Sequence, residues 1–190
     1  KTAIANDPEK VVNFFSGLAM NLYNKVGDRM KKTEYSSSFT VYDDVAMKNI
    51  ASLYRFGYLG EPDYKQAVAW YEKAAEAGNG SAMYELGEMY YWGYLGASDY
   101  ETAKSWYEKA AAKGEADAMF RLGYMYSNGM LEANDYNAAK DWYEKAAEAG
   151  DVYAMNNIGA LYENGNLGEP DYWTALKWYE KAAAGGNALS

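Results

Sequence analysis

The chain has 190 residues, enough for one or two domains with a packed core, and carries 18 Lys and Arg against 27 Asp and Glu. Its formal charge of -9 disfavours binding to the polyanionic backbone of nucleic acids. Histidine and cysteine are absent, which excludes thiol nucleophiles, disulfides, imidazole catalysis and metal sites built on either residue, so we expect no cofactor and no metal.

The first segment, residues 1–45, is predicted to form an N-terminal capping helix and a loop. Asp7 and Pro8 are typical of a helix start, and an apolar face follows to about Met30. Residues 31–43 have the composition of a loop that leads into a helix starting at Asp43-Asp44. A degenerate further repeat is the alternative. No run in the chain reaches the ~20 apolar residues of a membrane-spanning helix.

A repeat of 36 residues occupies the rest of the chain. The string Trp-Tyr-Glu-Lys-Ala-Ala recurs at this interval, starting at Trp70, Trp106, Trp142 and Trp178. Ala-Met and Asp-Tyr pairs recur in the same register. Four copies without an insertion indicate a repeat architecture. The predicted units are 46–81, 82–117, 118–153 and 154–190.

Each unit is predicted to contain two helices. In the second unit an amphipathic pattern is formed by Ala82, Leu86, Met89 and Tyr90. We expect Gly93 to end this helix in a left-handed conformation and Asp99 to cap the next one, which runs to Gly114. The same pattern predicts that the last helix ends at Gly186. Such helix pairs bury their apolar faces only when stacked on neighbouring pairs, as in an α-solenoid.

These motifs resemble the Sel-one-like repeat (SLR), a relative of the tetratricopeptide repeat, over residues 46–186. The residues that carry the resemblance are Leu86-Gly87 to Tyr90 in the first helix and the motif from Asp99 to Ala111 in the second. The resemblance implies an all-α, right-handed α/α superhelix that acts as a protein-interaction scaffold, often in bacterial secretion or host contact. It favours a periplasmic or secreted location over a cytoplasmic one.

A candidate partner-binding face lies on the first helices. Their third, seventh and tenth positions vary between the units and share one side of each helix. The resemblance places this side on the concave face of the stack. In the middle units it is aromatic, as binding patches often are. The candidate residues are Tyr84, Glu88, Tyr91, Trp92, Phe120 and Tyr124. The alternative is that these rings only pack across adjacent first helices.

The negative charge is confined to the last three units, whose net charges are -4, -3 and -2. This distribution allows a basic protein or peptide as the partner, with acidic groups steering its approach. Solubility alone is the other explanation.

An enzyme and a structural spacer are the alternatives to a binding scaffold. Some proteins of similar repeats have been linked to β-lactam hydrolysis, but no serine here starts the Ser-x-x-Lys motif of that chemistry. We therefore predict no enzymatic activity. At the far end, Trp173 and Leu176 replace polar residues of the second and third units. Either further repeats follow, which the repeat boundary favours, or this end docks on another molecule.

Overall fold

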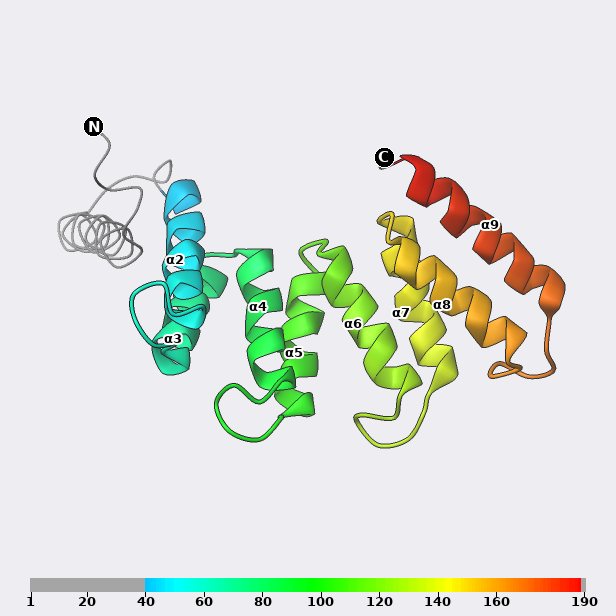
Figure 1. Cartoon of the computed structure of the whole chain (residues 1–190), viewed down its shortest axis with the longest axis horizontal. Coiled ribbons are helices and arrows are strands. Elements are labelled where there is room, and N and C mark those ends of the chain that lie inside the picture. Colours follow the sequence, from blue (N-terminus) through cyan, green and yellow to red (C-terminus); the bar gives the residue numbers. More distant parts are fainter. Residues whose placement is uncertain (1–39, 189–190) are drawn as a thin grey trace, which may run out of the picture. The chain divides into compact units, whose positions relative to one another are not determined.

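The computed structural model describes residues 40–188, and every regular element in this range is an α-helix (Figure 1). The expected capping helix before residue 31 lies outside the described residues. The chain divides into two compact units, Lys1–Asn79 and Gly80–Ser190. The described part of each unit consists of helix pairs joined by short loops, which confirms the predicted all-α repeat fold.

The first unit contains one described helix pair, α2 (Thr40–Arg55) and α3 (Tyr64–Glu76). The predicted start of α2 at Asp43-Asp44 is wrong, because the helix begins at Thr40. The two aspartates instead lie near the positive N-terminal end of the helix dipole, where carboxylates are favourable. The pair is closed by Ala51, which is fully buried, and by a 3.0 Å hydrogen bond between the hydroxyls of Ser52 and Tyr71.

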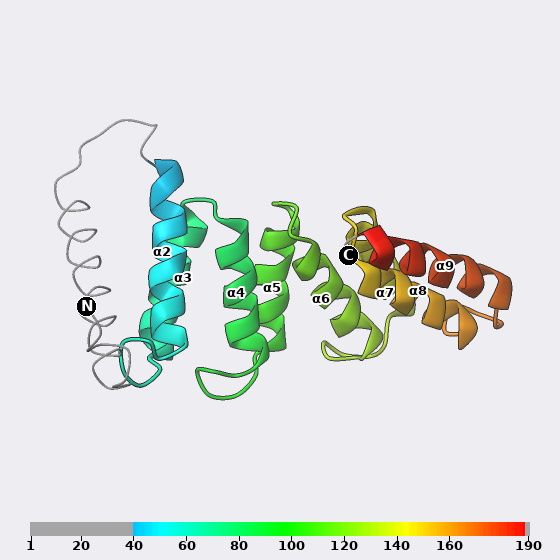
Figure 2. The ribbon, with the colours of Figure 1, turned by 45° about the horizontal axis from the view of Figure 1, so that its top comes forward.

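The second unit contains three helix pairs, in which each first helix packs on the second helix that follows it (Figure 2). Contacts of α5 with α6 and of α7 with α8 join one pair to the next. Corresponding helices start 36 residues apart, which confirms the period. The helices are α4 (Gly80–Tyr91), α5 (Tyr100–Ala111), α6 (Ala116–Ser127), α7 (Tyr136–Glu148), α8 (Val152–Glu163) and α9 (Tyr172–Ala188).

The helix ends follow from the glycines and aspartates that recur with the period. Gly93 has a φ of 66°, a left-handed conformation that glycine adopts without a steric penalty. The matching glycine of each of the other three repeats has the same conformation. Asp99 then accepts a 3.0 Å hydrogen bond from the backbone N–H of Thr102, three residues into α5. Equivalent N-cap bonds are made by Asp63, Asp135 and Asp171, which confirms the structural role of these aspartates.

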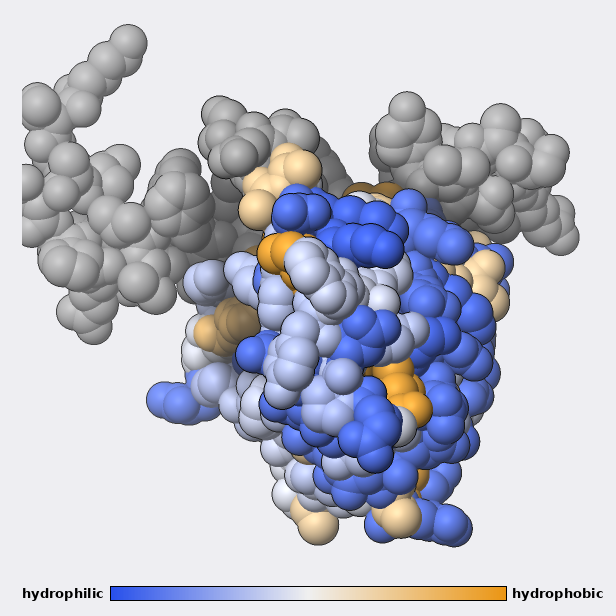
Figure 3. Space-filling view, turned by 90° about the vertical axis from the view of Figure 1, so that its right-hand side faces the viewer, coloured by the Kyte–Doolittle hydropathy of each residue, from blue (hydrophilic) through white to orange (hydrophobic). Residues whose placement is uncertain are grey.

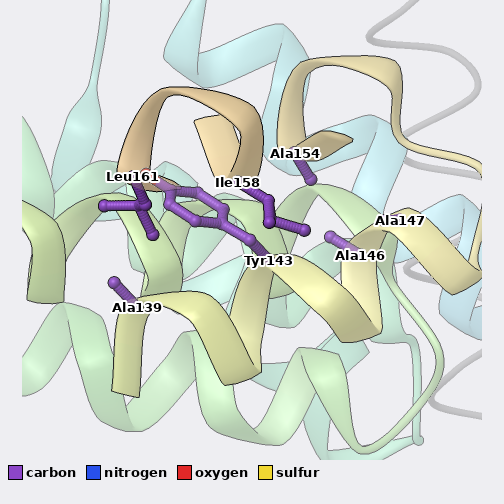
Figure 4. Packing of buried hydrophobic residues seen from close by; sticks show 7 residues of the cluster. All are labelled: Ala139, Tyr143, Ala146, Ala147, Ala154, Ile158 and Leu161. Atoms are coloured by element: carbon purple, nitrogen blue, oxygen red, sulfur yellow. The ribbon is translucent and has the colours of Figure 1, made fainter. Parts of the chain in front are cut away.

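The core of each pair in the second unit is a second-helix tyrosine set against a first-helix glycine. Figure 4 shows Tyr143 of α7 beside Ile158 and Leu161 of α8, with small alanines around it. On its other side, Tyr143 lies against Gly123 of α6, where a Cβ atom would come 2.6 Å from the ring. The ring therefore contacts both the helix before it and the helix after it, so one tyrosine joins two repeats.

The last helix does not end where the sequence predicts. Gly186 lies inside α9, which continues to Ala188. In the inner repeats the matching glycine has a positive φ, and the residue after it donates a backbone hydrogen bond back into the helix, as Asp151 does to Ala146. That bond belongs to the turn into the next first helix. The glycine alone does not stop α9, because glycine tolerates the right-handed helical conformation as well.

Candidate functional site

The predicted partner-binding face is built around a buried carboxylate, that of Glu88 on α4. One oxygen accepts a 2.6 Å hydrogen bond from the hydroxyl of Tyr107, on α5. The other accepts a 3.0 Å bond from the indole N–H of Trp92, one turn further along the chain. Both bonds fix the side chain in place, so Glu88 is part of the interior and not of the solvent-facing surface.

Arg121 of α6 supplies the positive charge that this carboxylate needs. Its Nε lies 2.8 Å from Glu88 Oε1, and its Nη2 donates a 3.0 Å bond to Oε2. The guanidinium thus makes the two-pronged contact that arginine and a carboxylate form best. Its Cζ also lies 5.4 Å from the Tyr91 ring centroid and 5.8 Å from that of Trp92. The ion pair ties the first helices of two successive repeats together.

Four aromatic rings form the more open part of the face. Phe120 and Tyr124 of α6 stack with centroids 6.5 Å apart, and Phe120 meets the Tyr153 ring of α8 at 6.4 Å. The ring centroid of Tyr84, on α4, lies 5.9 Å from that of Tyr107, and Tyr84 is half-buried. Tyr153 is 75% exposed. The rings therefore offer apolar surface from three successive first helices, held by contacts at their inner edges.

Burial and the Glu88 carboxylate favour the protonated form of two tyrosines in the cluster. Burial, with the nearby Glu88 carboxylate, raises the pKa of Tyr84 to about 12. The same two causes raise the pKa of Tyr107 well above its ordinary range. Burial alone would lower the pKa of Arg121, but Glu88 and Tyr84 raise it above its usual value. Tyr84 and Tyr107 therefore keep their hydroxyl protons, and Arg121 its charge, well above neutral pH.

The structure brings the six predicted residues together but exposes them unequally. Glu88 and Tyr91 are buried, and the Tyr91 hydroxyl donates to the sulfur of Met130 at 3.4 Å. Trp92 is 55% exposed, and the other three are half-buried. Arg121 and Tyr153 were not predicted. Neither lies at the third, seventh or tenth position of a predicted unit. An arginine next to the aromatic residues of a first helix was the signal that could have identified Arg121.

The second-helix motif has a feature that the sequence did not indicate. The lysine of the Trp-Tyr-Glu-Lys-Ala-Ala motif does not simply extend into solvent. Instead, its ammonium group lies over the tryptophan of the same motif, at 3.9 Å from the ring centroid for both Lys109 over Trp106 and Lys145 over Trp142. Such cation–π contacts stabilise each second helix by roughly 0.5–1 kcal/mol at an exposed site.

The hydroxyl of the core tyrosine has a different partner in each repeat. Tyr71 bonds Ser52 and Tyr107 bonds Glu88, both at the seventh position of a predicted unit. In the next two repeats the partner is at the tenth position, with Tyr143 bonded to Ser127 at 3.1 Å and Tyr179 donating to Glu163 at 2.6 Å. The variable positions of the first helices thus include these hydrogen-bond partners.

Two kinds of site are not seen in the described residues. Among residues 40–188, no group of acidic side chains has the arrangement of a metal site. In the same range, no helix combines the length and the apolar character needed to cross a bilayer.

Taken together, paired antiparallel helices, a 36-residue period and tyrosine–glycine contacts between neighbours define a helical-hairpin repeat protein of the tetratricopeptide-like class. The family model for the Sel1 repeat matches four successive segments, residues 44–79, 80–115, 116–151 and 152–187. The chain therefore belongs to the Sel1 repeat family, whose members are generally protein-interaction scaffolds and typically not catalysts.

The chain is similar to solved structures of bacterial proteins, and the first of them shows the same fold. A Sel1 repeat protein from Oxalobacter formigenes is 32% identical, with a TM-score of 0.70, and the match covers 92% of this chain and 71% of that protein. The protein c5321, a protective antigen of uropathogenic Escherichia coli strains with an SLR fold, is 27% identical over 77% of this chain and 39% of its own, with a TM-score of 0.43. No curated protein matches the sequence.

Proposed function

We propose that the protein binds a protein or peptide segment through the aromatic face of its first helices, the concave face in the family. The contact residues are Tyr84, Trp92, Phe120, Tyr124 and Tyr153. Glu88 and Tyr91 are buried and support this face through their contacts with Trp92. The observation that carries the proposal is that three successive first helices each present partly exposed aromatic rings, with α4 and α6 joined by a buried ion pair and α6 and α8 by a ring contact.

Aromatic side chains are suited to this role because they contribute a large contact area and lose little conformational entropy on binding. Trp92 is also anchored by its bond to Glu88, so its ring is held in one orientation before a partner arrives. A preorganised ring of this kind binds more tightly than a mobile one, since less ordering accompanies association.

The charge of the last three repeats supports a basic partner over a nucleic acid. Asp117, on the first turn of α6, is exposed close to Tyr84. Such rim charges act mainly on the rate of association. We expect the association rate of the identified partner to fall several-fold between low salt and 0.5 M NaCl, where the Debye length is only about 4 Å. A rate that does not depend on salt would remove the basic partner from the proposal.

The experiment is partner capture from the source organism, followed by affinity measurements on variants. Trp92→Ala combined with Tyr124→Ser should weaken binding by about 30-fold, as expected for loss of aromatic contacts worth ~2 kcal/mol. Tyr58→Ser, which removes an exposed ring from a loop of the first unit, is the control and should bind normally. If the double variant binds the captured partner as well as the unchanged chain does, the face is not the binding site.

A spacer role is the competing outcome of the same experiment. It would be indicated if no partner depends on any of the exposed rings. A periplasmic or secreted location is part of the proposal, and detection of the protein in the cytoplasmic fraction of the source cells would contradict it.

A further inference from the structure

The outer face of α9 carries two apolar residues at positions where α5 and α7 are polar. Trp173 is 77% exposed and Leu176 is 45% exposed. The matching residues of α5 and α7 are hydrophilic: Glu101 and Asn137 at the first position, and Lys104 and Lys140 at the second. Figure 3 faces this end of the chain and shows hydrophobic atoms among the blue ones. Exposed Trp and Leu on one helix face call for a partner.

The inner repeats show what this part of a second helix normally contacts. The ammonium group of Lys104 lies 5.6 Å from the ring centroid of Tyr126, on the following first helix. Ala147 of α7 is buried in a cluster with Ala154 and Ile158 of α8, whereas its counterpart Ala183 of α9 is exposed. The face of α9 is thus continuous with an established helix-packing surface. Its lysine, however, is replaced by Leu176, which suits an apolar neighbour better than a tyrosine hydroxyl.

The residues along this face are arranged so that two copies would complement each other. At 100° per residue, one stripe holds Trp173, Leu176, Lys177, Glu180 and Ala184, all of them exposed. The large Trp173 lies at one end of the stripe and the small Ala184 at the other. In an antiparallel pair of α9 helices, each tryptophan would therefore lie over the alanine of the second copy.

The charged residues of the stripe favour the same antiparallel alignment of the two helices. A two-fold axis midway between Trp173 and Ala184 is also midway between Lys177 and Glu180, so each lysine faces a glutamate of the second copy. Two such pairs form at once, because the interface is the same on both sides.

We propose that the protein forms a two-fold symmetric dimer through antiparallel packing of the α9 helices of two copies. One pair of helices is a small interface, at the low end of specific contacts, so the dissociation constant is expected to be on the order of 10 μM.

The test is analytical ultracentrifugation of the full chain between 1 and 200 μM. The mass should rise from 21.2 kDa towards twice that value over this range. Trp173→Asn with Leu176→Lys introduces the residues that α7 has at these positions, which are compatible with a folded second helix. This variant should remain a monomer at 200 μM. Tyr58→Ser, a change in the first unit, should leave dimerisation unchanged.

Charge variants test the register itself. Lys177→Glu places like charges opposite one another and should weaken the dimer at least several-fold, whereas Lys177→Glu with Glu180→Lys exchanges the charges and should restore it. The proposal is overturned if the unchanged chain is a monomer at 200 μM, as it would be if other parts of the molecule cover α9. It is also overturned if the dimer persists after the change at Trp173 and Leu176, or if the charge exchange fails to restore it.

Discussion

The ion pair between Glu88 and Arg121 allows a quantitative test with residues that the chain uses elsewhere. Asparagine occupies the position of Arg121 in the last repeat, as Asn157, and serine occupies that of Glu88 in the first, as Ser52. Arg121→Asn would leave the carboxylate buried with only two neutral donors, from Tyr107 and Trp92. Removing one member of a buried pair costs about 3–5 kcal/mol.

The exposure of the two side chains refines this range. The Glu88 side chain is 8% exposed and that of Arg121 is 24% exposed, so water screens the pair in part. We expect Arg121→Asn to lower the free energy of unfolding by about 3 kcal/mol, the lower end of the range for buried pairs. Glu88→Ser with Arg121→Asn should lower it by only about 1–2 kcal/mol, because no buried charge remains and Ser52 shows that serine can bond the core tyrosine.

The assay is urea unfolding of the four chains of the double-mutant cycle, followed by far-ultraviolet circular dichroism. The expected coupling energy between the two sites is roughly 2 kcal/mol. Two additive substitutions, or a single Arg121→Asn change within 0.5 kcal/mol of the unchanged chain, would refute the view that the pair fixes the base of the aromatic face.

Three further outcomes follow from the fold. The raised pKa of Tyr107, due to burial and Glu88, means that the folded state keeps a proton that the unfolded chain loses near pH 10, so stability is fully present below pH 10 and then falls by up to ~1.4 kcal/mol per pH unit. Urea midpoints at pH 8 to 11 measure this slope, which Tyr107→Phe should reduce but not abolish, because the pKa of Tyr84 is also raised. Gly123→Ala would place a Cβ atom 2.6 Å from Tyr143, so we expect a loss of ~1–3 kcal/mol in the same assay despite the better helix propensity of alanine. Stability unchanged by that substitution would show that the ring moves freely. Asp135→Ala removes an N-cap bond and should cost about 1 kcal/mol, whereas exposed Asp141→Ala should cost under ~0.5 kcal/mol, and equal costs would contradict the capping role.

The periodic residues predicted most of the fold. Asp99 and Gly93 mark helix boundaries through interactions within a few residues, so sequence spacing alone suffices to place them. The same holds for the assignment of two helices to each unit. The predicted end of α9 at Gly186 was wrong because a glycine allows a helix to end without forcing it to. In the inner repeats the turn at this glycine also depends on the first helix that follows it.

The candidate site was less predictable. Arg121 and Glu88 are 33 residues apart, and their contact depends on the rotation of two helices about their axes, which no single unit specifies. Variation between units was interpreted as freedom to bind a partner. At Glu88 it also reflects interior chemistry, because the position holds the hydroxyl partner of a core tyrosine. Whether the exposed rings bind a partner stays a prediction.

The changing partner of the core tyrosine has a consequence for how the chain finds its fold. Four similar second helices can dock on the wrong first helix and still make comparable apolar contacts. An incorrectly paired Tyr107 would lose Glu88, and Glu88 buried beside another tyrosine would lose Arg121. Each repeat therefore has its own hydrogen-bond partner for the core tyrosine, within an apolar core that the repeats share. In a chain of repeated motifs, these few unlike residues favour the correct order of assembly over its permutations.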